Sequence, residues 1–177
     1  MSLKFPISLT GKREDVAAVT ATELYDSGDN LVVSLGGDIP DNWQDNYTFT
    51  EPVYRRVVIG TSCTSIGTAA FRYQYDIIQN TTLIPDSVIT IKDKSFESAS
   101  NLGDLIIGKN VTSIGEYAFA FSTVNRIEIH AVTAPTIGLY AFNFVFPADS
   151  SIHVPSNATG YAASYDGLTV VYDLPAV

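Results

Sequence analysis

The sequence predicts a mainly β fold: a small right-handed β-solenoid with short parallel strands and an N-terminal arm. Two observations predict this fold. An Ile is followed by a Phe five residues later four times, and these isoleucines, Ile66, Ile91, Ile114 and Ile137, lie 25, 23 and 23 residues apart. A short run rich in β-forming residues, such as "DLIIGKNV", precedes each of them. Such a period with one short strand per unit is typical of a solenoid, in which each repeat buries the apolar side chains of its neighbours.

Residues 1–29 lie outside the repeats and are expected to form the arm. In "KFPISL", the apolar residues Phe5, Ile7 and Leu9 alternate with other residues, which is the pattern of a short strand with one apolar side. The next stretch, "REDVAAVTATELYDS", is compatible with a short helix or an extended arm, and "DSGDN" is expected to be a turn. The arm can cap the first repeat, or its residues Phe5, Ile7 and Leu9 can attach the protein to a neighbour.

Four repeats are expected over residues 59–155. The Phe of each repeat follows a small residue, which lets the backbone pack closely while the ring fills the core. These rings are Phe71, Phe96, Phe119 and Phe142. The strand residues expected to point inward are Ile59, Ile84, Ile107 and Ile129. Cys63 occupies a position at which the next two repeats have Val, so we expect a buried structural thiol.

The residue before each inward position should point to solvent, because side chains alternate along a strand. These outward positions are Val58, Leu83, Ile106, Glu128 and His153. Three stacked apolar residues on an exposed face need a cover. The N-terminal arm or the segment around Trp43 can supply it, or a partner protein can bind there. In the second case the polar rim of the interface consists of Arg56, Asp104, Arg126 and Glu128.

Two aromatic loops, "FRYQYD" and "FNFVFP", are a second candidate interface. Their candidate contact residues are Tyr73, Tyr75, Phe144 and Phe146. Tyr and Phe suit protein interfaces and the stacking of sugars. The alternative is that part of these rings belongs to the core.

The repeats resemble a known family. "VTSIGEYAF" followed by "IEI", with "IPDSVITI" in the preceding unit, is similar to the BspA-type leucine-rich repeats. The resemblance extends over residues 31–170. It implies a capping segment at residues 30–58 with a hairpin-like start and a capping Trp43, the solenoid at 59–155, and a C-terminal cap at 156–177. It also implies a non-enzymatic display module on a cell surface or viral particle that binds proteins or glycans.

Composition and motifs argue against several function classes. The formal net charge is -9, with 19 acidic against 10 basic residues, which is unfavourable for binding nucleic acid. The single cysteine excludes an internal disulfide, and no apolar run approaches the roughly 20 residues that a membrane helix needs. Phosphate-loop, dinucleotide and nucleophile-elbow motifs are absent. His130 and His153 are expected on different faces, in ordinary surface roles. We therefore expect no enzyme, and no catalytic, cofactor-binding or metal-binding residue.

The first function hypothesis is a non-enzymatic structural and adhesion protein displayed on an assembly. The preferred setting is the surface of a bacteriophage virion, as a head fibre or decoration protein, favoured by the small size, the acidic composition and the lack of a recognisable leader. Its partners would be capsid or neighbouring subunits bound through the N-terminal arm, so an oligomer or a larger assembly is expected. The alternative is a bacterial cell-surface adhesin domain that binds a host protein or a glycan.

Overall fold

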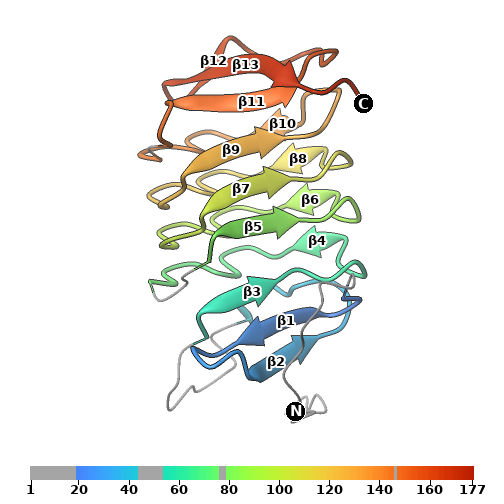
Figure 1. Ribbon diagram of the computed structural model, residues 1–177, viewed down its shortest axis with the longest axis vertical. Coiled ribbons are helices and arrows are strands. Elements are labelled where there is room, and N and C mark those ends of the chain that lie inside the picture. Colours follow the sequence, from blue (N-terminus) through green and yellow to red (C-terminus); the bar gives the residue numbers. More distant parts are fainter. Residues whose placement is uncertain (1–18, 44–53, 76–78, 146) are drawn as a thin grey trace.

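The computed structural model describes residues 19–43, 54–75, 79–145 and 147–177. In these residues the chain forms thirteen β-strands and no α-helix. Successive repeats wind into coils that stack along the long axis of the molecule, with β1–β3 at one end and β12–β13 at the other (Figure 1). The prediction of a mainly β, leucine-rich-repeat-like solenoid is confirmed.

The largest sheet has the strand order β12-β13-β11-β9-β7-β5. Its parallel members are β5 (Thr81–Ile84), β7 (Asp104–Ile107), β9 (Arg126–Ile129), β11 (Ser151–Pro155) and β13 (Leu168–Leu174). Ile84, Ile107 and Ile129 lie side by side in this sheet, and all three are fully buried. The predicted inward positions are therefore correct, since strand pairing stacks each Ile on the equivalent residue of the next coil.

A second sheet lies behind the first in Figure 1 and consists of very short parallel strands. They are β4 (Ser65–Ile66), β6 (Thr90–Ile91), β8 (Ser113–Ile114) and β10 (Thr136–Ile137). Each repeat Ile is paired with the repeat Ile of the neighbouring coil. Two residues per strand are enough here, because every coil contributes the same pair and the ladder continues through the stack.

The four repeat Phe side chains form a column inside the solenoid. They are almost completely buried, and their ring centroids are 5.0, 5.2 and 5.5 Å apart along the column. The backbone follows the same step, since the Phe96 amide donates to the Ala118 carbonyl at 2.7 Å and the Phe119 amide to the Ala141 carbonyl at 2.8 Å. Burying each ring contributes roughly 1.5–3 kcal/mol. Trp43 continues the column beyond Phe71, with the two ring centroids 6.0 Å apart and the ring planes at 70°.

The N-terminal end is an antiparallel sheet with the order β2-β1-β3, formed by β1 (Thr22–Tyr25), β2 (Leu31–Leu35) and β3 (Arg56–Val58). β1 is the central strand, and its Leu24 is fully buried. The boundary expected at residue 29 lies in the turn between β1 and β2. Of the two expected forms, a short helix or an extended arm, Thr22–Tyr25 has the extended one, and it pairs with β3. The attachment residues Phe5, Ile7 and Leu9 lie outside the described residues.

The C-terminal end is closed by a hairpin. β12 (Ser164–Tyr165) pairs antiparallel with β13, which in turn pairs parallel with β11. Antiparallel strands thus cover both ends of the stack, where a parallel ladder would leave backbone groups unpaired and open to association.

Aspartates link neighbouring coils through backbone amides. Asp38 Oδ1 accepts hydrogen bonds from the Thr64 amide at 2.7 Å, the Thr64 hydroxyl at 2.8 Å and the Ser65 amide at 2.8 Å. Asp93 Oδ1 accepts from the Glu116 amide at 2.8 Å in a later coil. These carboxylates bind amides at the start of β4 and in the turn after β8, and an ionised acceptor strengthens each bond.

We expect acid to destabilise the fold partly through Asp38, and Asp38→Asn to reduce this loss. Partial burial raises the pKa of Asp38, but the hydrogen bonds from Thr64 and Ser65 outweigh it, so the pKa is below the ordinary 3.8. A lowered folded pKa means that the stabilisation is present above the unfolded value and is lost as the pH falls through the folded value. Urea unfolding at neutral pH and near pH 2.5 measures the loss. The variant should lose less free energy of unfolding than the wild type, and an equal loss would contradict the prediction.

Candidate interaction surfaces

The described residues offer no site for metal or thiol chemistry. They contain no group of three or more His, Cys, Asp or Glu side chains that could hold a metal ion. Cys63 is fully buried, and burial raises the pKa of its thiol, which disfavours the reactive thiolate and fits the predicted structural role. In the same part of the chain, no helix has the length and apolar character to cross a membrane.

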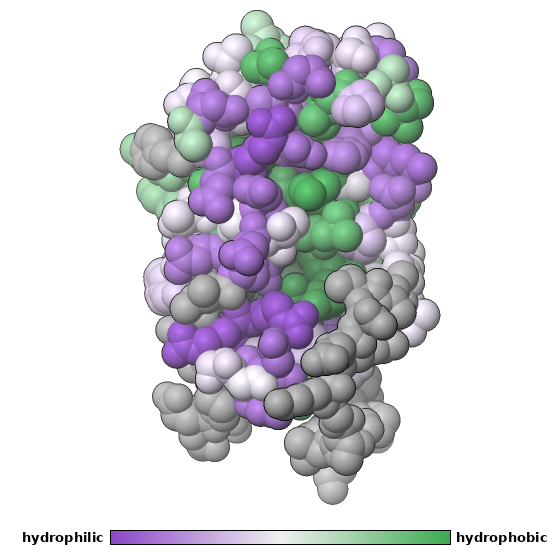
Figure 2. Space-filling model, in the orientation of Figure 1, coloured by the Kyte–Doolittle hydropathy of each residue, from purple (hydrophilic) through white to green (hydrophobic). Residues whose placement is uncertain are grey.

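The outer column of the large sheet is Leu83, Ile106, Glu128 and His153, which strand pairing places side by side. Leu83 is 56% exposed and Ile106 is half-buried, and Figure 2 shows apolar surface on this face beside a broad hydrophilic area. Val58, also predicted for this column, lies in β3 and pairs with β1 instead of β5. Trp43 does not cover the column, because its ring packs inside the core.

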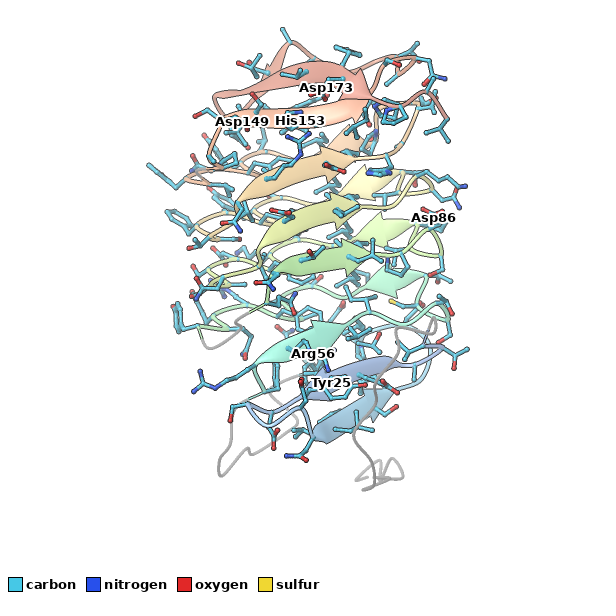
Figure 3. The ribbon with its side chains drawn as sticks, viewed as in Figure 1. Tyr25, Arg56, Asp86, Asp149, His153 and Asp173 are labelled. Atoms are coloured by element: carbon cyan, nitrogen blue, oxygen red, sulfur yellow. The ribbon has the colours of Figure 1, made fainter. Side chains whose placement is uncertain are left out.

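Three of the predicted rim residues, Arg56, Arg126 and Glu128, are engaged within the chain. The Arg56 guanidinium lies over the Tyr25 ring at 4.0 Å from its centroid and pairs with Asp29 at 3.1 Å (Figure 3). Arg126 Nε donates to Glu128 Oε1 at 2.8 Å. Asp104 is the strand partner of Arg126 in the neighbouring coil. The rim is therefore part of the fold, and its charges are partly compensated before any partner binds.

A group of charged side chains, named here the ion cluster, occupies the C-terminal half of this face. Its members are Arg126, Glu128, Asp149, His153 and Asp173. His153 lies between two carboxylates, with Nε2 at 2.7 Å from Asp149 Oδ2 and Nδ1 at 2.9 Å from Asp173 Oδ1 (Figure 3). Arg126 approaches Asp149 at 3.7 Å and Asp173 at 4.0 Å.

Two predictions for the histidines are wrong. His153 is only 4% exposed under its ionic neighbours, so it has no ordinary surface role. His130 was expected on the opposite face, yet its Nε2 lies 2.9 Å from Glu128 Oε2 and so joins the edge of the ion cluster. Strand alternation does not apply to His130, because β9 ends at Ile129. Burial raises the pKa of Glu128, but the hydrogen bonds and charges of His130 and Arg126 lower it by more than burial raises it. The pKa of Glu128 is therefore below its usual value.

The loop that follows each repeat Ile and contains the repeat Phe is named here the Phe loop. The four Phe loops carry two columns of residues with positive φ. Three residues after each repeat Ile, φ lies between 53° and 58°, and seven residues after it, between 54° and 60°. The first column is Ala69, Lys94, Tyr117 and Tyr140, and the second is Tyr73, Ser98, Phe121 and Phe144. This left-handed conformation costs about 1–2 kcal/mol for a residue other than Gly. Amide bonds to the next coil hold it, such as Phe121 N–H to the Asn143 carbonyl at 2.9 Å.

Exposed aromatic side chains gather in the third and fourth coils. Phe121 and Phe144 are 50% and 57% exposed, and their rings stack at 5.1 Å with an angle of 19°. The Tyr117 and Tyr140 rings lie 5.2 Å apart, and the neighbouring Leu139 is 71% exposed. These five side chains are named the aromatic patch. Only Phe144 of the patch was predicted, although Phe121 and Phe144 share one signal, a second Phe two residues after the repeat Phe.

The other predicted aromatic residues form a separate, smaller group. Tyr73 and Tyr75 are exposed, with their rings stacked at 6.2 Å. The Arg72 guanidinium lies over Tyr73 at 4.3 Å and pairs with Glu97 of the next coil. Phe146 lies outside the described residues. The structure therefore places the two predicted loops apart, and the third and fourth coils carry the larger aromatic surface.

Comparisons with known proteins identify the repeats. The family model described as the BspA type leucine rich repeat region matches residues 43–161 in six copies. The match begins at Trp43, the residue that continues the Phe column beyond Phe71. Comparisons with curated proteins and with solved structures gave no match.

Proposed function

Because the chain belongs to the BspA-type leucine-rich repeat family, we propose that it is a non-enzymatic protein-binding module that contacts its partner through the aromatic patch. The family is generally a scaffold for protein–protein interaction. What the fold supplies to this role is a rigid support. Equivalent side chains of neighbouring coils stack on one another, both in the Phe column and in the outer Phe121–Phe144 pair, so the coils hold these side chains at regular spacing.

The observation that carries the proposal is the combination of backbone conformation and exposure at Phe121 and Phe144. A Phe in the left-handed region costs conformational energy, and a half-exposed Phe recovers little of it by burial. Lys94 and Ser98 show that polar residues fit the same two columns. Folding alone therefore does not require large apolar side chains here, whereas binding a partner does.

The geometry favours a protein over a glycan as the partner. A sugar stacks on the open face of an aromatic ring. The Phe121 and Phe144 rings stack on each other, so one face of each ring is occupied by the other ring and is closed to a sugar. Ring edges pack well against aliphatic side chains and against the faces of other aromatic rings. Such contacts are typical of the apolar centre of a protein interface.

A random-peptide display library and a glycan array, both probed with the intact chain, test the proposal. We expect selected peptides to bind the wild type and to bind the double variant Phe121→Ala, Phe144→Ala at least about tenfold more weakly, since truncating central interface residues commonly costs more than 1 kcal/mol. The thermal midpoint should change little, because both side chains lie at the surface.

Two control variants make the test specific. Tyr172→Ala removes a comparably exposed aromatic side chain from the C-terminal cap and should leave peptide binding unchanged. Leu83→Ala probes the outer column of the large sheet. If Leu83→Ala abolishes binding and the double variant does not, the outer column is the binding surface. Glycan binding that depends on Phe121 and Phe144 would overturn the choice of a protein partner.

A second part of the proposal concerns the assembly or surface on which the module is displayed. We keep the bacteriophage head fibre or decoration protein as the first candidate and the bacterial cell-surface adhesin as the second. The small size and the acidic composition support the first. The solution mass of the full chain and of a variant lacking residues 1–18 separates them. Assembly that needs residues 1–18 supports attachment through Phe5, Ile7 and Leu9, whereas two monomers favour the adhesin.

A further inference from the structure

We propose that Asp149, His153 and Asp173 form a proton-dependent clamp that holds the C-terminal strand β13 on the solenoid while His153 is protonated. The three residues come from three places: the loop before β11, β11 itself and β13. Both carboxylates meet the same imidazole ring, so His153 links β13 to the body of the ladder through its side chain (Figure 3).

The hydrogen-bond chemistry requires the imidazolium form. An ionised carboxylate has only acceptors, and both ring nitrogens of His153 lie within 2.9 Å of a carboxylate oxygen. Each nitrogen must therefore carry a proton. A neutral ring has one N–H and one lone pair, and the lone pair would face a carboxylate oxygen at hydrogen-bond distance. Losing the proton therefore replaces one of the two bonds with a repulsive contact.

The balance of charges around His153 also favours a protonated ring. Glu128 and Arg126 face it from β9, Asp149 from the preceding loop and Asp173 from β13, while His130 contacts Glu128 at the edge. Three carboxylates thus surround two cations, Arg126 and the protonated His153. When His153 is neutral, only Arg126 remains at the centre of the ion cluster. Burial raises the pKa of Asp149, but the hydrogen bonds from His153 and the Ser151 amide, together with the charges of His153 and Arg126, lower it by more, so the pKa lies below its usual value.

The clamp acts at the end of the ladder, where the backbone pairing of β13 is interrupted. On one side β13 pairs with β11, and this pairing shifts register between Val154 and Pro155. On its other side lies β12, which has two residues. Asp173 lies beside the irregularity, so the bond to His153 supports the strand at the position where backbone pairing is interrupted.

Amide hydrogen exchange of the full chain at pH 5.5 and at pH 9, corrected for intrinsic rates, tests the clamp across the range in which histidine commonly loses its charge. We expect the protection of β13 amides to fall at least about tenfold at the higher pH, while β7 amides in the same sample keep theirs. Nitrogen NMR of the His153 ring should show two N–H groups at the lower pH.

The variant Asp173→Asn separates this clamp from an ordinary ionic contact. An amide at that position can donate to Nδ1, so a neutral His153 keeps both of its bonds and β13 protection should no longer depend on pH. Glu116→Gln removes an exposed carboxylate outside the ion cluster and should behave like the wild type. A ring with one N–H at pH 5.5, or wild-type β13 protection that is equal at both pH values, overturns the proposal. So does a pH-dependent loss in Asp173→Asn as large as in the wild type. The two wild-type measurements decide the matter even where the variant does not fold.

Discussion

Phe119→Ala should lower the free energy of unfolding by about 3–5 kcal/mol, the range measured for truncating a buried Phe to Ala. Phe119 is fully buried in the middle of the Phe column, with Phe96 at 5.2 Å and Phe142 at 5.5 Å. Its removal leaves a cavity between two rings that the adjoining coils hold in place through backbone bonds, so little collapse can fill the space. Urea unfolding followed by circular dichroism measures the loss.

The matched control lies two residues further along the same loop. Phe121→Ala removes an identical side chain that is half-exposed, and we expect a loss of at most about 1 kcal/mol. A loss of less than about 1 kcal/mol for Phe119→Ala itself would contradict the register of the repeats. The pair of variants thus separates the architectural Phe of the repeat from the Phe proposed to bind a partner.

Gly103→Ala should destabilise the fold by about 2–5 kcal/mol, because it adds backbone strain and a steric conflict together. Gly103 has φ of +65°, a conformation that L side chains rarely adopt. A Cβ at this position would lie 2.2 Å from the backbone carbonyl group of Asn80 in the preceding coil. The hydrogen bond of the Asp104 amide to that carbonyl, 2.8 Å long, draws the two coils together at this point. Relief requires the coils to separate where β7 begins.

Gly37→Ala isolates the strain alone. Gly37 has φ of +75°, but an added Cβ would meet nothing within 4 Å. We expect it to cost only the 1–2 kcal/mol or so of the left-handed conformation. Thermal and urea unfolding of both variants measure the difference, and equal losses at the two glycines would show that close approach of the coils is not the dominant cost at Gly103.

The core of this fold could be predicted, because the residues that form it recur in every repeat of the sequence. The Ile, the small residue and the Phe recur at nearly fixed spacing, so the buried column and the strand register follow from aligning the units. Cys63 could be placed in the core by the same alignment, because the equivalent residues are Val88 and Val111. Because equivalent residues of neighbouring repeats pair with each other, the local pattern of one repeat also predicts contacts between residues far apart in the sequence.

The features outside the repeat could not be predicted in this way. Asp149, His153 and Asp173 converge from different segments, and alternation along single strands does not show that one ring contacts two carboxylates. β1 was expected in an arm because Thr22–Tyr25 has no equivalent in the repeats, yet it is the central strand of the N-terminal sheet. Of the aromatic residues with positive φ, Tyr73 and Phe144 were expected in the two aromatic loops. Phe121, Tyr117 and Tyr140 were not, because aromatic residues rarely adopt these backbone angles and no propensity points to them.

The break between the N-terminal sheet, which ends with β3, and the large sheet, which begins with β5, has a mechanical consequence. In the described residues β3 belongs to the sheet of β1 and β2, while β5 begins the long ladder, and a side-chain bond from the Val57 amide to Gln79 Oε1 at 3.0 Å spans this step. On the opposite side of the coil the pairing of β4 with β6 and the stacking of Phe71 on Phe96 continue across it. In the described residues, backbone pairing thus continues across this step on one side of the coil and is interrupted on the other. A load on the N-terminal end should therefore bend the solenoid at this step before it shears the ladder.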